Sequence, residues 1–214
     1  MQRQVRIYCS SVEQAKSSVL RATSGTARGR ATTSSQRQRI LVELKQLEDL
    51  NQTKRPVYSP LINGSWALVY QNPLEEEPDK EASAEKVEGP FLSFFQPFTR
   101  GIVSTKSNLQ RIDLESKSID NLAEFTLLGV GGYLNIKGSA VQISDDRVEV
   151  GFIDCELKLG PLQPLKIPLE WVKARGWVET TYLDETLRIG RGDKGSIFLA
   201  ARISNKEWPV TKPA

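Results

Sequence analysis

Hydrophobic and polar positions alternate with two different periods along this chain, and the change comes near Asn63. Before it, apolar residues recur three and four positions apart, which is typical of helices that lie with one face on a core. This spacing predicts helices over 11–22 and 36–51, joined by a loop rich in Ser, Thr and Gly. We expect Ser34 or Ser35 to cap the second helix.

After that point the period is two, which is the pattern of half-buried strands. Trp66, Leu68 and Tyr70 are expected to share one face of the first strand, because successive side chains of a strand point to opposite sides. Further strand-like runs follow at short intervals. These runs are 100–114, 121–128, 132–143, 146–157, 166–172, 176–182, 186–191 and 196–203.

So many short strands with no helix between them predict a mainly β fold, either an antiparallel barrel or a sandwich. A barrel of about eight strands is wide enough to hold one small ligand, whereas a filled sandwich has no cavity. Val148, Val150 and Phe152 are expected to share one face of a later strand. The pattern leaves open which face points inward.

The composition argues against catalysis and against a metal or cofactor. The chain has no histidine, so His-dependent nucleophiles, His general bases and His metal ligands are excluded. Its two cysteines, Cys9 and Cys155, fit neither a disulfide framework nor a zinc site, and we expect Cys155 to be a small buried hydrophobe. Asp184 and Glu185 are adjacent and therefore point to opposite faces of a strand. We expect Asp184 to cap a turn or to pair with Arg188.

Charge is unevenly distributed. Residues 1–39 hold eight basic side chains against one acidic one, a net charge of +7 that leaves −4 for the remainder of a chain whose total is +3. A basic, Ser/Thr-rich start is typical of an organelle transit peptide, and a solvated basic helix face is the alternative. Nucleic-acid binding is not expected, because stacking aromatics do not interleave with these cations.

Two segments after the first strand have unusual composition. Residues 72–89 are rich in Glu and are expected to form a solvated acidic loop. The segment from Phe91 to Phe98 is rich in aromatics and contains Pro97. It is expected either to touch a membrane or to form a core strand that ends at the proline.

Gly64 and Trp66 form a Gly-x-Trp motif at the start of the first strand, which resembles the entry motif of lipocalins. There, an arginine from a late strand packs on the tryptophan ring, and Arg188, Arg191 and Arg202 are candidates for this role. A charge inside an apolar strand is costly unless it is paired. We therefore expect Arg188 or Arg191 to be partly buried and to pair with an acid, for which Asp184 is the first choice, or to stack on an aromatic ring.

A wider resemblance extends over almost the whole chain after about residue 11. The C-terminal block that begins at Tyr182, together with the strand 61–70 and the second helix with its Leu-Glu-x-Leu-Asn end, is similar to the plastid lipid-associated proteins, or fibrillins. The residues matching the family signature are Gly64, Trp66, Tyr182, Leu183, Asp184, Arg188, Arg191 and Gly192.

The resemblance implies a lipocalin-like antiparallel β-barrel over 57–214, a preface of two amphipathic helices over 11–56 and a tail over 1–10 that is a possible remnant of a transit peptide. It implies a non-enzymatic chloroplast protein, stromal or associated with plastoglobules or thylakoids. An apolar cavity in the barrel would bind or sequester a carotenoid, quinone, tocopherol or acyl lipid. The alternative is an adaptor that binds a prenyl-chain synthase or another lipid-biosynthesis enzyme. The candidate ligand-binding residues are Trp66, Leu68, Tyr70, Phe125, Val150, Phe152, Trp177, Tyr182 and Arg188.

Overall fold

The computed structural model describes residues 2–72, 103–169, 171, 175–193 and 195–204. Two helices, α1 (Gln2–Thr23) and α2 (Ser34–Asp49), precede the strands, with two short 3-10 turns between α2 and the first strand. The strands are β1 (Gly64–Gln71), β2 (Val103–Asp113), β3 (Ser118–Leu127), β4 (Val130–Gln142), β5 (Arg147–Leu159), β6 (Leu165–Pro168), β7 (Arg175–Leu183), β8 (Leu187–Gly192) and β9 (Ile197–Ile203).

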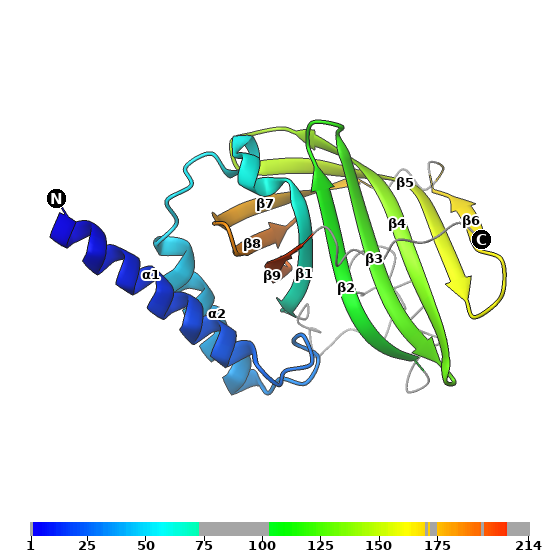
Figure 1. Ribbon diagram of the computed structural model, residues 1–214, viewed down its shortest axis with the longest axis horizontal. Coiled ribbons are helices and arrows are strands. Elements are labelled where there is room, and N and C mark those ends of the chain that lie inside the picture. Colours follow the sequence, from blue (N-terminus) through cyan, green and yellow to red (C-terminus); the bar gives the residue numbers. More distant parts are fainter. Residues whose placement is uncertain (1, 73–102, 170, 172–174, 194, 205–214) are drawn as a thin grey trace, which may run out of the picture.

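Eight of these strands pair into a closed ring, and Figure 1 shows how they are arranged. Hydrogen-bonded neighbours follow the order β4-β3-β2-β1-β9-β8-β7-β5, and β4 also pairs with β5. Strand β6 pairs with β5 alone and lies beside the ring. All the pairings are antiparallel. The expected mainly β, antiparallel barrel-like fold with two N-terminal helices is confirmed, and β1 to β9 lie within a few residues of the predicted runs.

The interior is filled at one end by a cluster that includes Trp66, Ile119, Val150 and Leu183. Most of its members come from β1, β2, β3, β4, β5, β7 and β9, and Val57, Ile62 and Leu114 come from the turns next to them. Side chains from strands on opposite sides of a closed ring can meet only inside it, so this cluster identifies the inward face of each strand. We call this part of the barrel the closed end. The expected common face of Val148, Val150 and Phe152 is confirmed, and it points inward.

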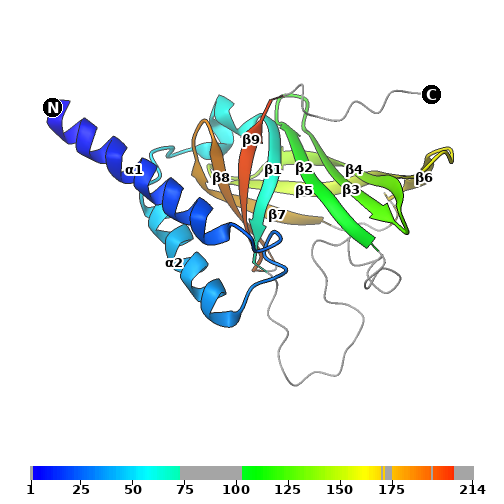
Figure 2. The ribbon, with the colours of Figure 1, turned by 60° about the horizontal axis from the view of Figure 1, so that its bottom comes forward.

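The two helices pack on the outside of the barrel, next to β1, β7, β8 and β9 (Figure 2). The stripe of Ile40, Leu44 and Leu47 on α2 is fully buried there, as its three- and four-residue spacing predicts. The same cluster contains Val19, Tyr70, Tyr182, Leu187, Ile189 and Leu199. One side of these strands therefore faces the helices and the other faces the barrel interior, so both sides are apolar.

Two of the four β-bulges in the described ladders change which of the candidate ligand residues point inward. In β1 an extra residue lies between Leu68 and Tyr70 opposite β9, so Trp66 belongs to the interior cluster and Tyr70 to the helix-covered cluster. The expectation that Trp66, Leu68 and Tyr70 share one face is wrong for Tyr70, because one inserted residue reverses the alternation. A second bulge in β7, before Tyr182, likewise turns this ring outward.

Both helices begin earlier than the sequence pattern predicts. Helix α1 starts at Gln2 and therefore includes most of the segment that was expected to be a tail. The cap of α2 is Thr33, whose side chain accepts a hydrogen bond from the Gln36 backbone N–H while the Gln36 side chain binds back to Thr33. The expected caps at Ser34 and Ser35 are wrong, because the reciprocal pair forms one residue earlier, between Thr33 and Gln36, and both serines lie within the helix.

Candidate ligand site inside the barrel

At the closed end, the guanidinium of Arg202 lies over the indole ring of Trp66, with its carbon 4.2 Å from the ring centre. Arg202 also donates to the backbone carbonyls of Asn63 (3.0 Å), Glu185 (2.8 Å) and Leu61. The lipocalin-like packing of a late-strand arginine on this tryptophan is confirmed, and Arg202 makes the closer of the two stacks on it. This arginine therefore seals the end of the barrel.

Gly64 makes that seal possible. Its φ of +128° lies in the region that favours glycine, and a Cβ at this position would come within 2.6 Å of the Arg202 Nη1 atom. Any larger residue would push the guanidinium away from its carbonyl acceptors. The Gly-x-Trp motif thus has a steric reason in this chain.

Arg188 lies deeper in the interior and is only 3% exposed. Its guanidinium carbon is 5.5 Å from the Trp66 ring and 5.2 Å from the Phe198 ring. One of its nitrogens donates to the side-chain oxygen of Gln110, whose amide in turn donates to Asn121 over 2.8 Å. Burial, followed by the nearby charge of Arg202, lowers the pKa of Arg188 to about 9. The expected stacking of a buried signature arginine on an aromatic ring is confirmed.

The ring of Phe198 reaches Arg188 because Gly190 leaves room for it. A Cβ at Gly190 would lie 2.1 Å from this ring, so a side chain there would displace the phenylalanine. Gly190 and Phe198 are cross-strand partners on β8 and β9, and they face inward with Arg188. Gly190 of β8 therefore allows the Phe198 ring to lie next to the Arg188 guanidinium.

Among the described residues of this interior, two buried side-chain atoms have no hydrogen-bond partner, Nε of Arg188 and Oδ1 of Asn108. Asn108 occupies the inward position of β2 next to Gln110, on the side away from the closed end. Buried polar atoms are nearly always hydrogen-bonded in folded proteins, and each one left unpaired costs about 1–3 kcal/mol. Nor does any carboxylate of the described residues pair with Arg188.

Arg191 lies on the opposite side of β8, outside the barrel. It makes two hydrogen bonds with Glu48 of α2, of 2.7 and 2.9 Å, and Thr181 donates to the same carboxylate over 2.6 Å. The hydrogen bond with Glu48 raises the pKa of Arg191. This pair joins the helices to the barrel wall across 143 positions of sequence.

Asp184 also lies outside, where it accepts hydrogen bonds from the backbone N–H groups of Thr186 and Leu187, both at 2.7 Å. Tyr182 donates to it over 2.7 Å, and Lys16 of α1 lies 2.9 Å away. Burial opposes ionisation, but these hydrogen bonds outweigh it and lower the pKa of Asp184 to about 2. The expected turn cap is confirmed. The expected pairing of Asp184 with Arg188 is wrong, because the barrel wall separates them.

At the other end of the interior, which we call the far end, Phe125 and Phe152 continue the inward alternation of β3 and β5. They pack with Ala123 on a third cluster made of Leu134, Ile136, Cys155 and Leu169. Ala123, Phe125 and Phe152 are themselves only partly buried. The cluster at the closed end is thus made of buried residues, whereas these three residues at the far end are only partly buried.

Cys155 is buried, as expected. Burial, followed by the charges of Asp154 and Glu156, raises the pKa of its thiol to about 11, so the reactive thiolate form is disfavoured. Across the described residues, no three acidic, cysteine or histidine side chains gather as a metal site.

The candidate ligand residues divide between the two sides of the wall. Six face the interior, some at the closed end and others toward the far end. These are Trp66, Leu68, Phe125, Val150, Phe152 and Arg188. Tyr70 and Tyr182 lie under the helices. Trp177 lies on the outer surface, where the Arg147 guanidinium is 4.3 Å from its ring. These three residues are outside the interior site.

Sequence reasoning missed the polar part of this interior, Asn108, Gln110 and Asn121. Their amides alternate with other residues in strands, which is also the pattern of a solvent-facing side.

The Phe91–Phe98 segment and the acidic loop from residue 73 onward lie outside the described residues.

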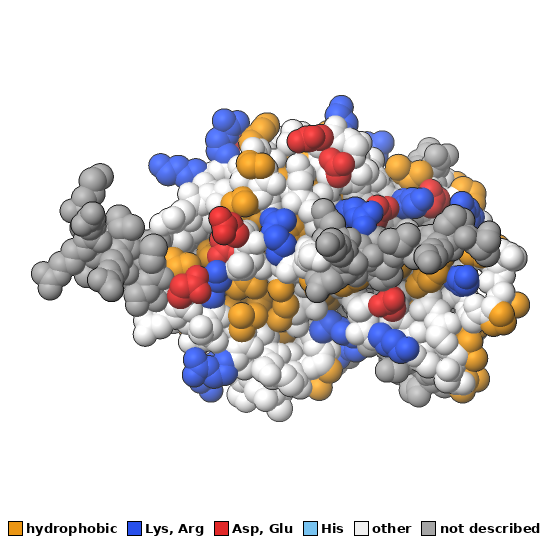
Figure 3. All heavy atoms as spheres, in the orientation of Figure 1, with side chains coloured by type: hydrophobic (Ala, Val, Ile, Leu, Met, Phe, Trp, Pro, Cys, Tyr) orange, Lys and Arg blue, Asp and Glu red, His pale blue; other side chains and the backbone are white. Residues whose placement is uncertain are grey.

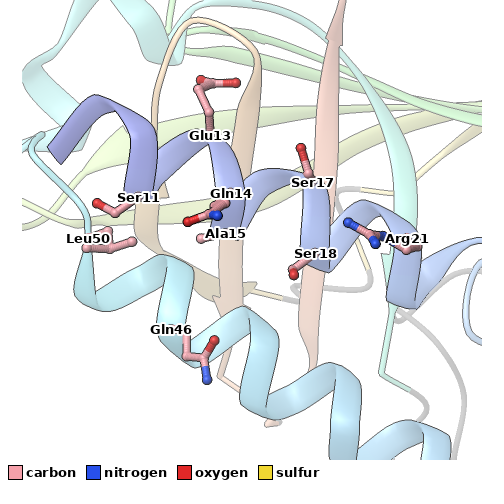
Figure 4. A pocket seen from close by; sticks show the side chains of 9 residues that line it. All are labelled: Ser11, Glu13, Gln14, Ala15, Ser17, Ser18, Arg21, Gln46 and Leu50. Carbon is pink, nitrogen blue, oxygen red and sulfur yellow. The ribbon is translucent and has the colours of Figure 1, made fainter. Parts of the chain in front are cut away.

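A groove lies between α1 and α2 (Figure 4). It is lined mainly by polar side chains, which makes it a poor match for a lipid. These are Ser11, Glu13, Gln14, Ser17, Ser18, Arg21 and Gln46, with Ala15 and Leu50. Neither helix has a stretch of sufficient length and hydrophobicity for a membrane span.

The closed ring of antiparallel strands and the sealed Trp66–Arg202 end define a lipocalin-like barrel protein. The family model PAP_fibrillin matches residues 13–201, so the chain belongs to the plastid lipid-associated protein, or fibrillin, family. No solved structure matches it.

Relatives of known name agree with this membership. The chain is 29% identical to the plastid lipid-associated protein 3, chloroplastic, of Brassica campestris, over 83% of this chain and 57% of the relative. It is 27% identical to plastoglobulin-1, chloroplastic, of Pisum sativum, over 89% and 61% respectively. It is 25% identical to the light-induced protein, chloroplastic, of Solanum tuberosum, over 95% and 71%. The chain thus spans little more than half the length of the first of these relatives.

Proposed function

We propose that this chain is a non-enzymatic plastid protein that holds a hydrophobic metabolite inside its barrel. A carotenoid, quinone, tocopherol or acyl lipid is the class of ligand that the family membership favours. The observation that carries the proposal is the partly exposed state of Ala123, Phe125 and Phe152, although they face inward. Covering such surface with a ligand gains about 25 cal/mol for each Å² of apolar area removed from water.

The names of the relatives support the location. They include the words chloroplastic and plastoglobulin, so we place this protein in the plastid, in contact with plastoglobules or thylakoids.

A patch of exposed apolar side chains at the far end supports contact with lipid. Leu128 and Val130 in the β3–β4 hairpin and Leu162 and Leu165 around the β5–β6 turn are exposed, Leu128 at 80%. A hydrogen bond from the Gly160 backbone to a β4 carbonyl joins the two turns. In Figure 3, orange side chains appear along the edge of the molecule where β5 and β6 lie in Figure 1. Clustered apolar exposure of this kind marks contact surfaces.

Filling the interior tests ligand binding. Ala123→Trp adds a large apolar side chain at the far end, and a fluorescent polyene lipid reports occupancy of the purified protein. We expect binding to fall at least tenfold with the melting temperature nearly unchanged. The control is Val141→Trp, at an exposed position on β4. If the interior were already full, Ala123→Trp would instead destabilise the fold by about 1–3 kcal/mol, and the wild type would not bind the probe.

The adaptor function, which rests on the acidic loop and the basic helices, stays a prediction, because the loop from residue 73 onward lies outside the described residues. Retrieval of a lipid-biosynthesis enzyme from plastid stroma, with no lipid co-purifying by mass spectrometry, would favour it over the barrel ligand.

A further inference from the structure

We propose that Arg188, with the amides of Gln110 and Asn108, is the head-group site for a long-chain carboxylate held in the barrel. This inference rests on the proposed function and names the chemistry of its ligand. The apolar chain would lie along the far end, against Phe125 and Phe152, while the carboxylate reaches inward to the guanidinium.

The first support is the charge of Arg188. This side chain is 3% exposed, and among the described residues it has no carboxylate partner. Its neighbour Arg202 has the same sign and lowers its pKa further. A buried charge without a counter-charge is costly. A ligand that brings one negative charge would remove that cost.

The second support is the pair of unpartnered atoms. Nε of Arg188 is a donor without an acceptor, and a carboxylate offers two acceptor oxygens in the geometry that a guanidinium matches. Asn108 is one inward position further along β2, on the route to the far end. Its amide can turn by 180° and present its NH₂ group as a donor, because the two orientations have nearly the same shape.

The count of cations favours a single negative charge. Arg188 and Arg202 are the cations on inward strand positions of the described residues, and Arg202 is already bonded to the carbonyls of Leu61, Asn63 and Glu185. One available guanidinium balances a carboxylate. A diphosphate would bring more negative charge into the interior than this one guanidinium can balance. A neutral head group would leave the charge of Arg188 without a counter-charge.

The apolar surroundings strengthen such a contact. The Arg188 guanidinium lies between the rings of Trp66 and Phe198, where little water competes for it. A charge-assisted hydrogen bond is about twice as strong as a neutral one, and low local dielectric increases the attraction. The same rings hold the guanidinium in place before a ligand arrives.

A ligand series on the wild-type protein tests the proposal without any mutation. Hexadecanoate, hexadecanol and farnesyl diphosphate compete for the same fluorescent polyene at pH 7.5. We expect hexadecanoate to bind about tenfold or more tightly than hexadecanol, and the diphosphate to bind more weakly than hexadecanoate. Equal affinity for acid and alcohol, or a preference for the diphosphate, would overturn the head-group site while leaving barrel binding intact. No binding of any of the three would overturn the proposed function as well.

Arg188→Met assigns the preference to this residue, with Arg147→Met on the outer surface as the matched control. The Arg188 variant should bind acid and alcohol within about twofold of each other, while the control keeps the wild-type ratio. The ¹³C-carboxyl signal of labelled hexadecanoate gives a second readout, because Arg188 should depress the carboxyl pKa of the bound ligand. A bound carboxyl that titrates in the wild type as it does in Arg188→Met would contradict the contact.

Discussion

Strand β8 carries two arginines three residues apart, and the strand turns them to opposite sides of the barrel wall. Outside, Arg191 meets Glu48 of α2 in a two-point ion pair, and the pKa of the guanidinium is raised. Inside, Arg188 meets two aromatic rings and a neutral amide, and its pKa is lowered to about 9. Of these two arginines in one short strand, Arg191 is thus paired with a carboxylate on the outer side, and Arg188 lacks a counter-charge among the described residues on the inner side.

The difference extends to the two regions around these arginines. On the helix-covered side, Lys16, Glu48, Asp184 and Arg191 all have charged partners across the α1, α2 and β7–β8 contact. On the interior side, Arg188 has no charged partner among the described residues, and its Nε atom and Oδ1 of Asn108 lack hydrogen-bond partners. Nε of Arg37 on α2 also lacks a hydrogen-bond partner, so the two sides differ in charge balance and not in every hydrogen bond. The outer side is an assembly contact between helices and barrel, whereas the buried charge of Arg188 on the inner side is unbalanced in the manner of a binding site.

The largest expected effect tests whether the outer side holds the fold together. Ile189 is fully buried between β8 and the helices, so Ile189→Ala should lower the free energy of unfolding by about 2–5 kcal/mol. Urea denaturation followed by circular dichroism measures it. The control Val141→Ala, at an exposed position on β4, should change stability by less than about 0.5 kcal/mol. A small effect of Ile189→Ala would mean that the helices contribute little to stability.

A smaller effect comes from the ion pair on that side. The Glu48 carboxylate is mostly buried and accepts from Arg191 and Thr181. Glu48→Gln should cost about 1–2 kcal/mol, a value reduced because the Arg191 side chain is 37% exposed. Asp49→Asn removes an exposed carboxylate of the same helix that pairs with Lys45, and should cost less than about 0.5 kcal/mol. Equal losses in the two variants would show that the Glu48 contact has no special role.

The pH dependence of stability should reveal how much the ionised carboxylate of Asp184 stabilises the outer side. Its folded-state pKa of about 2 lies below the ordinary value of 3.8. The stabilisation is therefore fully present above pH 4 and is lost as the pH falls through 2. Asp184→Asn should be less stable than the wild type by about 1–2 kcal/mol at pH 7. Thermal melts of both proteins between pH 7 and pH 2 should show this difference shrinking at the acid end, and a constant difference would contradict it.

The strands and the helix stripes could be predicted because their periods are local properties of the chain. The two bulges could not. In β1 the apolar run around Trp66 and Tyr70 is compatible with either face, because the helices cover one side and the interior lies on the other. The extra residue between Leu68 and Tyr70 therefore leaves no mark in the hydrophobic pattern, although it decides which aromatic ring enters the barrel.

The apolar part of the site and Arg188 could be predicted from the sequence, but its neutral polar part could not. Trp66 was predicted because it is a tryptophan at the start of a strand, and Arg188 because it is a charged residue in an apolar strand. Asn108 and Gln110 were not, because polar residues at alternate strand positions suggest a solvated face. The contact of Arg191 with Glu48 could not be predicted either, because the two residues are 143 positions apart in sequence and the carboxylate of Asp184 is much nearer along the chain. Pairing across such distances depends on the closed fold.

The smallest expected effect on stability is the one that separates the two arginines. Arg188→Met keeps an unbranched side chain between Trp66 and Phe198 and removes a buried charge that lacks a counter-charge. The lost attraction to the two rings is worth about 0.5–2 kcal/mol, and the relieved burial of charge offsets it. The free energy of unfolding should therefore stay within about 1 kcal/mol of the wild type, whereas Arg191→Met should lose about 1–2 kcal/mol because the mostly buried Glu48 carboxylate keeps only the hydrogen bond from Thr181 and loses its counter-charge. Parallel urea titrations compare the two variants. A loss well above 3 kcal/mol in Arg188→Met would show that this arginine is needed for the fold itself, and the contrast between the inner and outer sides of β8 would then fail.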